Sequence, residues 1–183
     1  HDKPIWLHPA RSDNHADYQT EDRSLHQIWW ALGWAYETSA AMARLAFSGL
    51  FDKLPGLQVI CHHWGGYIPH AEGRISPSWE TRGERTGDKS STGGMAALKH
   101  PLMDYFKMFY GDTAMFGAQA ASQCGFDFFG AEHSLFATDC PYDSKGGAIL
   151  IRDTIKVVNA LDCTDADRTT MFEGNAKRML GLG

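Results

Sequence analysis

Strand and helix patterns alternate along this chain, and each predicted strand ends in a polar residue. Short apolar runs typical of buried strands occupy residues 4–8, 57–63, 108–111 and 134–138. Segments with helical patterns lie between and after them, at residues 37–51, 71–82, 101–106, 116–124, 147–161 and 164–180. Strands that alternate with helices predict a parallel sheet, here in about four βα units. The sequence therefore predicts an α/β fold, either half of a (β/α)8 barrel or a small open doubly wound sheet.

Composition narrows the class of protein. The 183 residues suit one domain spanning residues 1–183, and a net charge of -5 without a basic stripe argues against a nucleic-acid partner. No apolar run is long enough for a membrane helix, and no glycine-rich phosphate loop follows a predicted strand. The four cysteines lack CxxC spacing, which predicts free thiols and a cytoplasmic protein: Cys61, Cys124, Cys140 and Cys163.

The segment 57–66 carries the clearest chemical signal. A predicted strand runs directly into His62 and His63, and Gly65 and Gly66 follow. The glycines allow the backbone to turn and a ligand to approach closely. Because neighbouring side chains leave a strand on opposite faces, only one of the two histidines is expected to face a site. The structural alternative is a buried histidine pair that caps the strand.

Polar residues at the other strand ends extend this signal. His8, His63, Asp112 and Asp139 each stand where a predicted strand stops. In a parallel barrel such residues point to one rim, which is the face that carries active sites. Two imidazoles and a carboxylate suit a divalent metal, with zinc favoured and manganese also compatible. The structural alternatives are a histidine bonded to backbone at His8 and turn caps at both aspartates, and for Asp112 we favour the cap.

Two further groups have open interpretations. An aromatic cluster after the first predicted strand is either core or the wall of a pocket for an aromatic substrate. It consists of Trp29, Trp30, Trp34 and Tyr36. The remaining histidines lie in polar segments and are expected to be solvated: His1, His15, His26, His70, His100 and His133.

Four motifs together resemble one family. Residues 59–69, which read VICHHWGGYIP, and residues 72–75, which read EGRI, resemble the His-x-Gly-Gly…Pro…Gly-Arg-Ile signature of the amidohydrolase-related family. That family includes aminocarboxymuconate semialdehyde decarboxylase and γ-resorcylate decarboxylase. Residues 7–9 (LHP), 137–141 (ATDCP) and 174–180 (GNAKRML) are similar to its other motifs, in the same order.

The resemblance implies a metal-dependent (β/α)8 TIM barrel and a role for each matching residue. His8 would be a metal ligand, and Asp139 would be the metal-bound aspartate of the last strand. His63 would be the catalytic acid or base. Arg74 matches an arginine that reaches a substrate carboxylate across a dimer interface in some family members. His62 has no family counterpart, so we expect it to be structural.

One part of the family pattern is missing. The family's first strand carries His-x-His or Glu-x-His, and nothing in this sequence corresponds to it. The chain also opens at His1 with no initiator methionine, as though cut from something longer. We therefore expect the C-terminal half of the barrel. A lone half-barrel would expose two unpaired strand edges, so a homo-oligomer is expected.

The resemblance implies an enzyme acting on a small molecule. The leading hypothesis is metal-dependent, non-oxidative decarboxylation of a small aromatic or unsaturated carboxylic acid, with Trp34 among the residues that bind it. Metal-dependent hydrolysis of a lactone, ester or amide uses the same ligands, so the motifs leave both reactions open. A third hypothesis is a non-catalytic half-barrel that binds a partner or only assembles.

Overall fold

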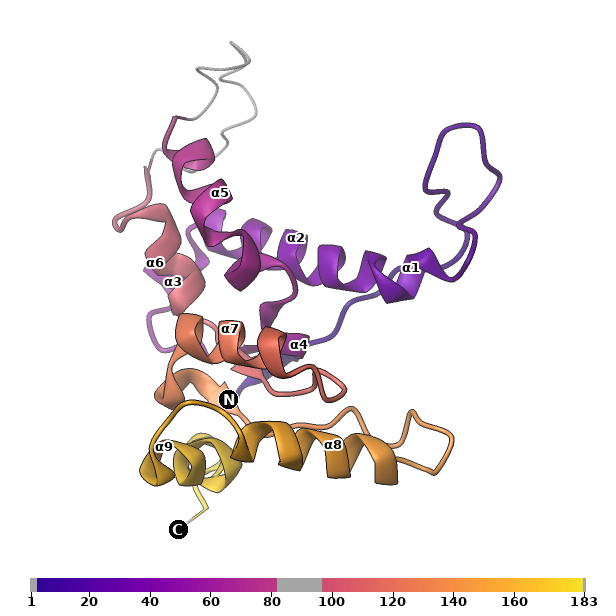
Figure 1. The fold of residues 1–183 in the computed structure, drawn as a ribbon. Helices are drawn as coiled ribbons and strands as arrows, with labels where there is room; N and C mark the ends of the chain where they lie inside the picture. The colour runs from indigo at the N-terminus through magenta and orange to yellow at the C-terminus, as the bar shows by residue number, and fades with distance from the viewer. Residues whose placement is uncertain (1–2, 82–96, 183) are drawn as a thin grey trace.

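The fold is built on one parallel sheet. A computed structural model describes residues 3–81 and 97–182 (Figure 1), and the loop expected at residues 86–94 lies outside them. The strands pair in the order β1-β2-β3-β4, each parallel to its neighbour. They are β1 (Ile5–Leu7), β2 (Val59–Cys61), β3 (Tyr110–Asp112) and β4 (Ser134–Leu135). The predicted α/β fold with a parallel sheet is confirmed, and all four predicted strand positions hold a strand.

Helices connect the strands. In Figure 1, α2 and α8 begin on the same side of the molecule and run back across it, as helices that follow parallel strands do. The α-helices are α1 (Ile28–Ala31), α2 (Gly33–Phe47), α3 (Leu50–Lys53), α4 (His62–Gly65), α5 (Ile68–Glu80), α6 (Leu102–Lys107), α7 (Gln119–Phe129), α8 (Ala148–Asn159), α9 (Asp165–Thr169) and α10 (Asn175–Leu180). A 3-10 turn, η2 (Ala131–His133), and a π-helical turn, η3 (Thr170–Gly174), complete the set.

Two predicted helices have the wrong boundaries for a physical reason. The helix predicted at 37–51 is divided between α2 and α3, because Gly49 adopts a left-handed conformation with φ of 71°. The helix predicted at 116–124 begins only at Gln119, because Phe116 and Gly117 both have positive φ. The cap predicted at Thr164 is confirmed, since its side chain accepts a hydrogen bond from the Asp167 amide in a capping box.

The strands divide their side chains between two apolar clusters. Val59 and Cys61 belong to the larger one, which lies between the sheet and the helices and includes the buried Trp64. Ile60 points to the opposite face, where Met179 of α10 packs on it. This period-2 alternation follows from strand geometry. The C-terminal helix α10 therefore covers part of the face of the sheet to which Ile60 points.

The structure also bears on the expectations from composition. All four cysteines are free thiols. Within residues 3–81 and 97–182, no helix has the length and apolar character needed to cross a membrane. His133 was expected to be solvated, and this is wrong: its ring is partly buried and stacks on Tyr110 at 4.4 Å, and its Nδ1 lies 2.9 Å from the Phe109 carbonyl oxygen.

Packing around Trp64 predicts unequal effects of two glycine substitutions in helices. A Cβ added to Gly125 in α7 would lie 2.7 Å from the Cβ of Trp64 and closer still to its ring, whereas one added to Gly73 in α5 meets nothing within 4 Å. We expect Gly125→Ala to lower the free energy of unfolding by about 2 kcal/mol through overpacking. Gly73→Ala should leave it unchanged or raise it by up to about 1 kcal/mol. Urea titration of both variants measures the difference, and equal effects would contradict this packing.

Candidate active site

A large pocket lies at the carboxyl ends of the strands. Its volume is about 1140 Å³, and it is lined by His8 after β1, by His62 and His63 after β2, and by Asp139 after β4. Indole rings from α1 and α2 form another part of its wall. The structure thus brings together strand-end residues that are more than 130 positions apart in the sequence, from His8 to Asp139, as a parallel sheet requires.

The two histidines lie on a tight turn immediately after β2. The strand ends at Cys61, and His63 and Trp64 then adopt left-handed conformations with φ of 55° and 50°. Both imidazoles line the pocket. The expectation that only one histidine would face a site is therefore wrong, because it assumed that the strand continued to His63.

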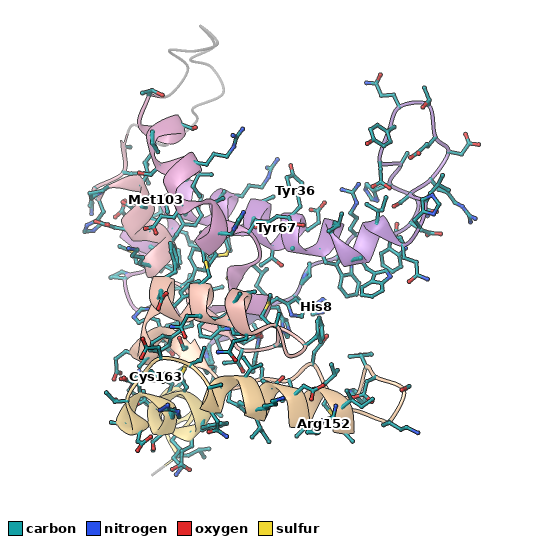
Figure 2. The ribbon with its side chains drawn as sticks, viewed as in Figure 1. His8, Tyr36, Tyr67, Met103, Arg152 and Cys163 are labelled. Atoms are coloured by element: carbon teal, nitrogen blue, oxygen red, sulfur yellow. The ribbon has the colours of Figure 1, made fainter. Side chains whose placement is uncertain are left out.

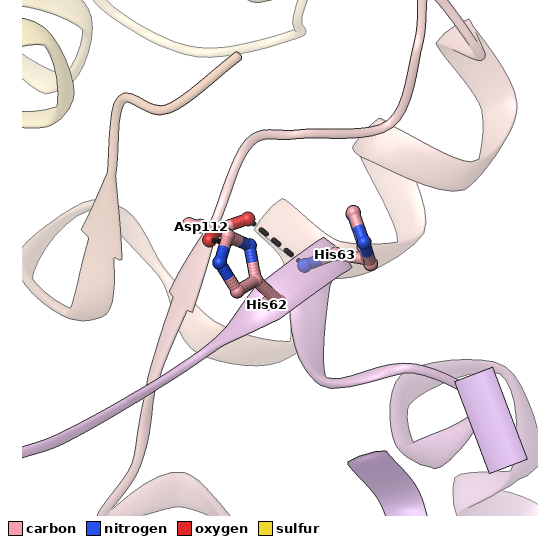
Figure 3. A group of neighbouring side chains, drawn as sticks. All are labelled: His62, His63 and Asp112. Carbon is pink, nitrogen blue, oxygen red and sulfur yellow. Dashed lines mark hydrogen bonds and ion pairs between the residues drawn. The ribbon is translucent and has the colours of Figure 1, made fainter. Parts of the chain in front are cut away.

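Asp112, at the end of β3, contacts both histidines and does not itself line the pocket. Its carboxylate is fully buried. Oδ1 accepts hydrogen bonds from the backbone N–H of His63 at 2.9 Å and of Ala114 at 3.2 Å. Oδ2 accepts one from Trp6 Nε1 at 3.0 Å and lies 2.7 Å from His62 Nδ1 (Figure 3). The predicted turn cap is confirmed by the bond from Ala114, and the contact with His62 is a further role.

The His62–Asp112 pair shifts the pKa of both groups. Burial lowers the pKa of His62, but the adjacent Asp112 carboxylate outweighs burial and leaves that pKa above its ordinary value. Burial raises the pKa of Asp112, but His62 and the His63 N–H outweigh it and leave that pKa lowered. The contact is short without the alignment of a good hydrogen bond. The side-chain contact and the attraction of opposite charges both contribute to these pKa shifts.

Two other imidazoles are oriented by backbone carbonyl groups. His63 Nδ1 lies 2.5 Å from the carbonyl oxygen of Ala114, and His8 Nδ1 lies 2.7 Å from that of Pro9. A carbonyl oxygen only accepts, so each Nδ1 carries the proton and each Nε2 is left for another partner. The backbone bond considered for His8 is thus present. It also prepares the ring as a ligand, since metal-bound histidines are commonly oriented in this way.

The aromatic cluster is not core. Trp29, Trp30 and Trp34 line the pocket, with the Trp29 and Trp34 rings in a T-shaped contact at 5.6 Å. Trp34 is held by a hydrogen bond from its Nε1 to the Arg11 carbonyl oxygen and by an edge contact with His8. Tyr36 is 57% exposed and is not part of the lining. In Figure 2, Tyr36 and His8 are drawn on opposite sides of α2.

Arg74 is not brought to the pocket of its own chain. It lies on α5, its side chain is exposed, and it is absent from the residues that line the cavity. By contrast, sequence reasoning gave no site role to His62 and favoured only a turn cap for Asp112. The adjacency of His62 to His63 was a possible signal. No signal indicates the pairing of His62 with Asp112, because 50 positions separate them.

The donor groups present fit a divalent transition metal. Ligand atoms of His62, His63 and Asp112 lie within 4.8 Å of one another. Asp112, however, already accepts three N–H groups and is fully buried. The Nε2 atoms of His8 and His63 stay available, as does Asp139, whose carboxylate accepts no hydrogen bond found among the described residues. Imidazole nitrogen and carboxylate oxygen are the ligands that zinc and manganese accept.

Comparison with known proteins shows the family of this chain. The sequence profile of the amidohydrolase family matches residues 1–182. The chain belongs to the amidohydrolase family. It is 31% identical to a γ-resorcylate decarboxylase from Polaromonas sp. over 187 residues, which cover 99% of this chain and 51% of that protein. It is 25% identical to a 2-amino-3-carboxymuconate-6-semialdehyde decarboxylase from Dictyostelium discoideum, covering 97% of this chain and 45% of the relative.

Solved structures agree. A dihydroxybenzoic acid decarboxylase from Polaromonas sp., with bound manganese and the inhibitor 2-nitroresorcinol, superposes with a TM-score of 0.72 at 26% identity. The match covers 99% of this chain and 50% of the other. A 2,6-dihydroxybenzoate decarboxylase from Rhizobium with bound 2,6-dihydroxybenzoate gives a TM-score of 0.72 at 26% identity, covering 99% and 52%. The chain spans about half the length of these relatives, and its parallel sheet is part of a (β/α)8 barrel.

The pKa shifts predict how the His62–Asp112 pair stabilises the metal-free protein as pH changes. The raised pKa of His62 means that its contribution is complete below about pH 6.5 and is lost as pH rises through the raised value. The lowered pKa of Asp112 means that its contribution is complete above about pH 4 and is lost as pH falls further.

We therefore expect His62→Gln to destabilise the protein most near about pH 5.5 and least near about pH 9. Thermal unfolding with a chelator present, at a series of pH values, measures the difference between wild type and variant. His100→Gln is the control, because the side chain of His100 is half exposed and its Nε2 lies 3.9 Å from Asp52. A difference for His62→Gln that grows toward high pH would contradict the assigned pairing.

Proposed function

We propose that this chain forms part of the active site of a metal-dependent, non-oxidative decarboxylase of a small aromatic carboxylic acid. The observation that carries the proposal is the pocket itself, in which imidazole and carboxylate groups share one cavity with four tryptophans. Relatives named as decarboxylases of γ-resorcylate and dihydroxybenzoate support it. The metal contacts that the family supplies from its first strand have no counterpart in this sequence. The decarboxylase activity is therefore proposed for the whole protein, of which this chain supplies part of the active site.

His8, through Nε2, and Asp139 would hold the metal. Both line the pocket, and His8 is oriented by the Pro9 carbonyl oxygen. When bound, a divalent ion supplies positive charge that orients the substrate carboxylate and a neighbouring hydroxyl or oxo group. Zinc suits these donors, and the manganese in a solved relative supports manganese equally well.

His63 would be the catalytic acid. Its Nδ1–H donates to the Ala114 carbonyl oxygen, so Nε2 is the nitrogen that exchanges a proton with the substrate. As the bond to the carboxyl group breaks, its electron pair stays on the substrate carbon and carbon dioxide leaves. The protonated Nε2 of His63 then delivers its proton to that carbon, and the imidazole becomes neutral.

The remaining proposed contacts concern the substrate. Trp34, fixed by Arg11 and by Trp29, would pack against an aromatic ring. Arg74 would bind the substrate carboxylate. Because it is exposed and lies outside the pocket of its own chain, it would do so in the pocket of a second copy. A homo-oligomer is therefore part of the proposal. The free thiols suggest a cytoplasmic location.

The first test measures the reaction. The chain, reconstituted with manganese or zinc, is assayed for carbon dioxide release from hydroxybenzoates and for hydrolysis of a panel of lactones, esters and amides. We expect carbon dioxide release, and His63→Gln should lower kcat by about 100-fold or more with the fold retained. His100→Gln, outside the pocket, is the control.

Other outcomes have a clear meaning. Hydrolysis without carbon dioxide release would replace the decarboxylase with the hydrolase. No activity together with less than about a tenth of an equivalent of bound metal would favour the non-catalytic half-barrel, since missing ligands weaken a metal site severely.

A second test concerns the aromatic wall. We expect Trp34→Leu to raise KM for an aromatic acid by about 10-fold, which corresponds to the loss of one aromatic contact, and to leave metal content unchanged. Tyr36→Leu is a matched control, since Tyr36 lies on the same helix but is exposed and outside the pocket. Steady-state kinetics of both variants measure the two KM values. Equal KM values for the two would show that Trp34 does not contact the substrate.

A further inference from the structure

We propose that Asp112 is a positioning residue for this site. Its buried carboxylate holds the turn after β2 in the conformation that directs both His62 and His63 toward the pocket. The catalytic consequence of this role rests on the proposed function, whereas the structural consequence does not.

The turn needs something to hold it. His63 and Trp64 both adopt left-handed conformations, which cost about 1 to 2 kcal/mol for each residue other than glycine. A segment in this state persists only where its surroundings over-determine it. Two anchors are present in the structure, one for each of the two residues.

The first anchor is the packing of Trp64. Its ring is buried against Gly111 of β3 and Gly125 of α7, and neither position has room for a Cβ beside it. This contact fixes the side of the turn that faces the core. It does not touch the two imidazoles, which lie on the pocket side.

The second anchor is Asp112. Its Oδ1 accepts the His63 N–H at 2.9 Å, and the same oxygen accepts the Ala114 N–H at 3.2 Å. The carbonyl oxygen of Ala114 is in turn the acceptor for His63 Nδ1. One carboxylate oxygen thus fixes both the backbone of His63 and the residue that orients its ring. The tautomer that leaves Nε2 for the substrate depends on both contacts.

The other oxygen fixes His62. Oδ2 lies 2.7 Å from His62 Nδ1 and accepts a hydrogen bond from Trp6 Nε1, so it joins β1 to the turn after β2. Trp6 also stacks on the His62 ring at 5.8 Å. All three hydrogen-bonding partners of the carboxylate are N–H donors. An asparagine has a single acceptor oxygen, so it would set an NH₂ group against at least one of them.

The test compares two buried aspartates. Asp112→Asn is matched with Asp52→Asn, because Asp52 also has a mostly buried side chain and accepts a hydrogen bond from Tyr105 Oη at 2.7 Å, outside this pocket. The imidazole ¹⁵N and ¹H resonances of the metal-free chain report the tautomer of each histidine independently of any activity. They are assigned to His62 and His63 with single histidine variants.

We expect wild type and Asp52→Asn to show His63 with the proton on Nδ1. In Asp112→Asn the His62 and His63 resonances should move toward a mixture of tautomers. The kcat for decarboxylation should fall by about 10-fold or more, with KM changed by less than about 2-fold, as for a group that orients a catalyst. A folded Asp112→Asn protein with imidazole resonances identical to those of wild type would overturn the proposal.

A second variant covers the case in which Asp112→Asn does not fold. Trp6→Phe keeps a smaller aromatic ring beside His62 and removes the N–H donor to Oδ2. Its His62 resonances should shift while those of His63 shift less, and unchanged His62 resonances would overturn the proposal. A wild-type chain without decarboxylase activity would contradict the proposed function alone, since the tautomers are read without substrate.

Discussion

The buried carboxylate of Asp112 is the contact on which the rest of this site depends. It lies at the end of β3 and joins three chain segments: the indole of Trp6 on β1, the turn after β2, and the Ala114 amide beyond β3. A buried charge is costly unless it is paired and hydrogen-bonded, and each of these partners contributes to that pairing. The histidines are held as a consequence of satisfying this one anion.

The parallel sheet makes that arrangement possible. Since all four strands point the same way, the residues after β1, β2 and β4 reach one rim, and Asp112 at the end of β3 lies directly beneath it. The packing of Trp64 against two glycines then fixes the position of the turn after β2 relative to the sheet. A larger side chain at either glycine would displace Trp64 and with it the histidines. Core packing and the chemistry of the site are thus coupled through one turn.

The pocket above the carboxylate combines two kinds of wall. Imidazoles and Asp139 form the polar wall, and tryptophans from α1 and α2 provide flat apolar surface. Polar groups gain electrostatic strength beside such a wall because water is partly excluded. An aromatic acid, with a planar ring and a carboxylate, has the features that match both. Membership of the amidohydrolase family agrees with this division of the pocket.

Patterns of residue type and spacing were enough to predict the order of strands and helices, the parallel sheet, the Thr164 cap and the presence of His8, His63 and Asp139 in segments that follow strands. These features depend on local periodicity and on neighbours a few positions apart, which a sequence displays directly. Helix limits were less predictable. A positive φ at Phe116 is not visible in the residue pattern, whereas Gly49 is of the residue type that commonly ends a helix.

Tertiary structure decided the rest. It ended β2 before His62, placed both imidazoles in the pocket and decided that the tryptophans form the wall of the pocket. It also paired His62 with Asp112 across 50 positions. Contacts at such separations are determined by how strands pair and how Trp64 packs on β3 and α7, and no local pattern encodes them. The sequence by itself therefore determined which residues reach the strand ends, and only the folded chain determined which of them meet.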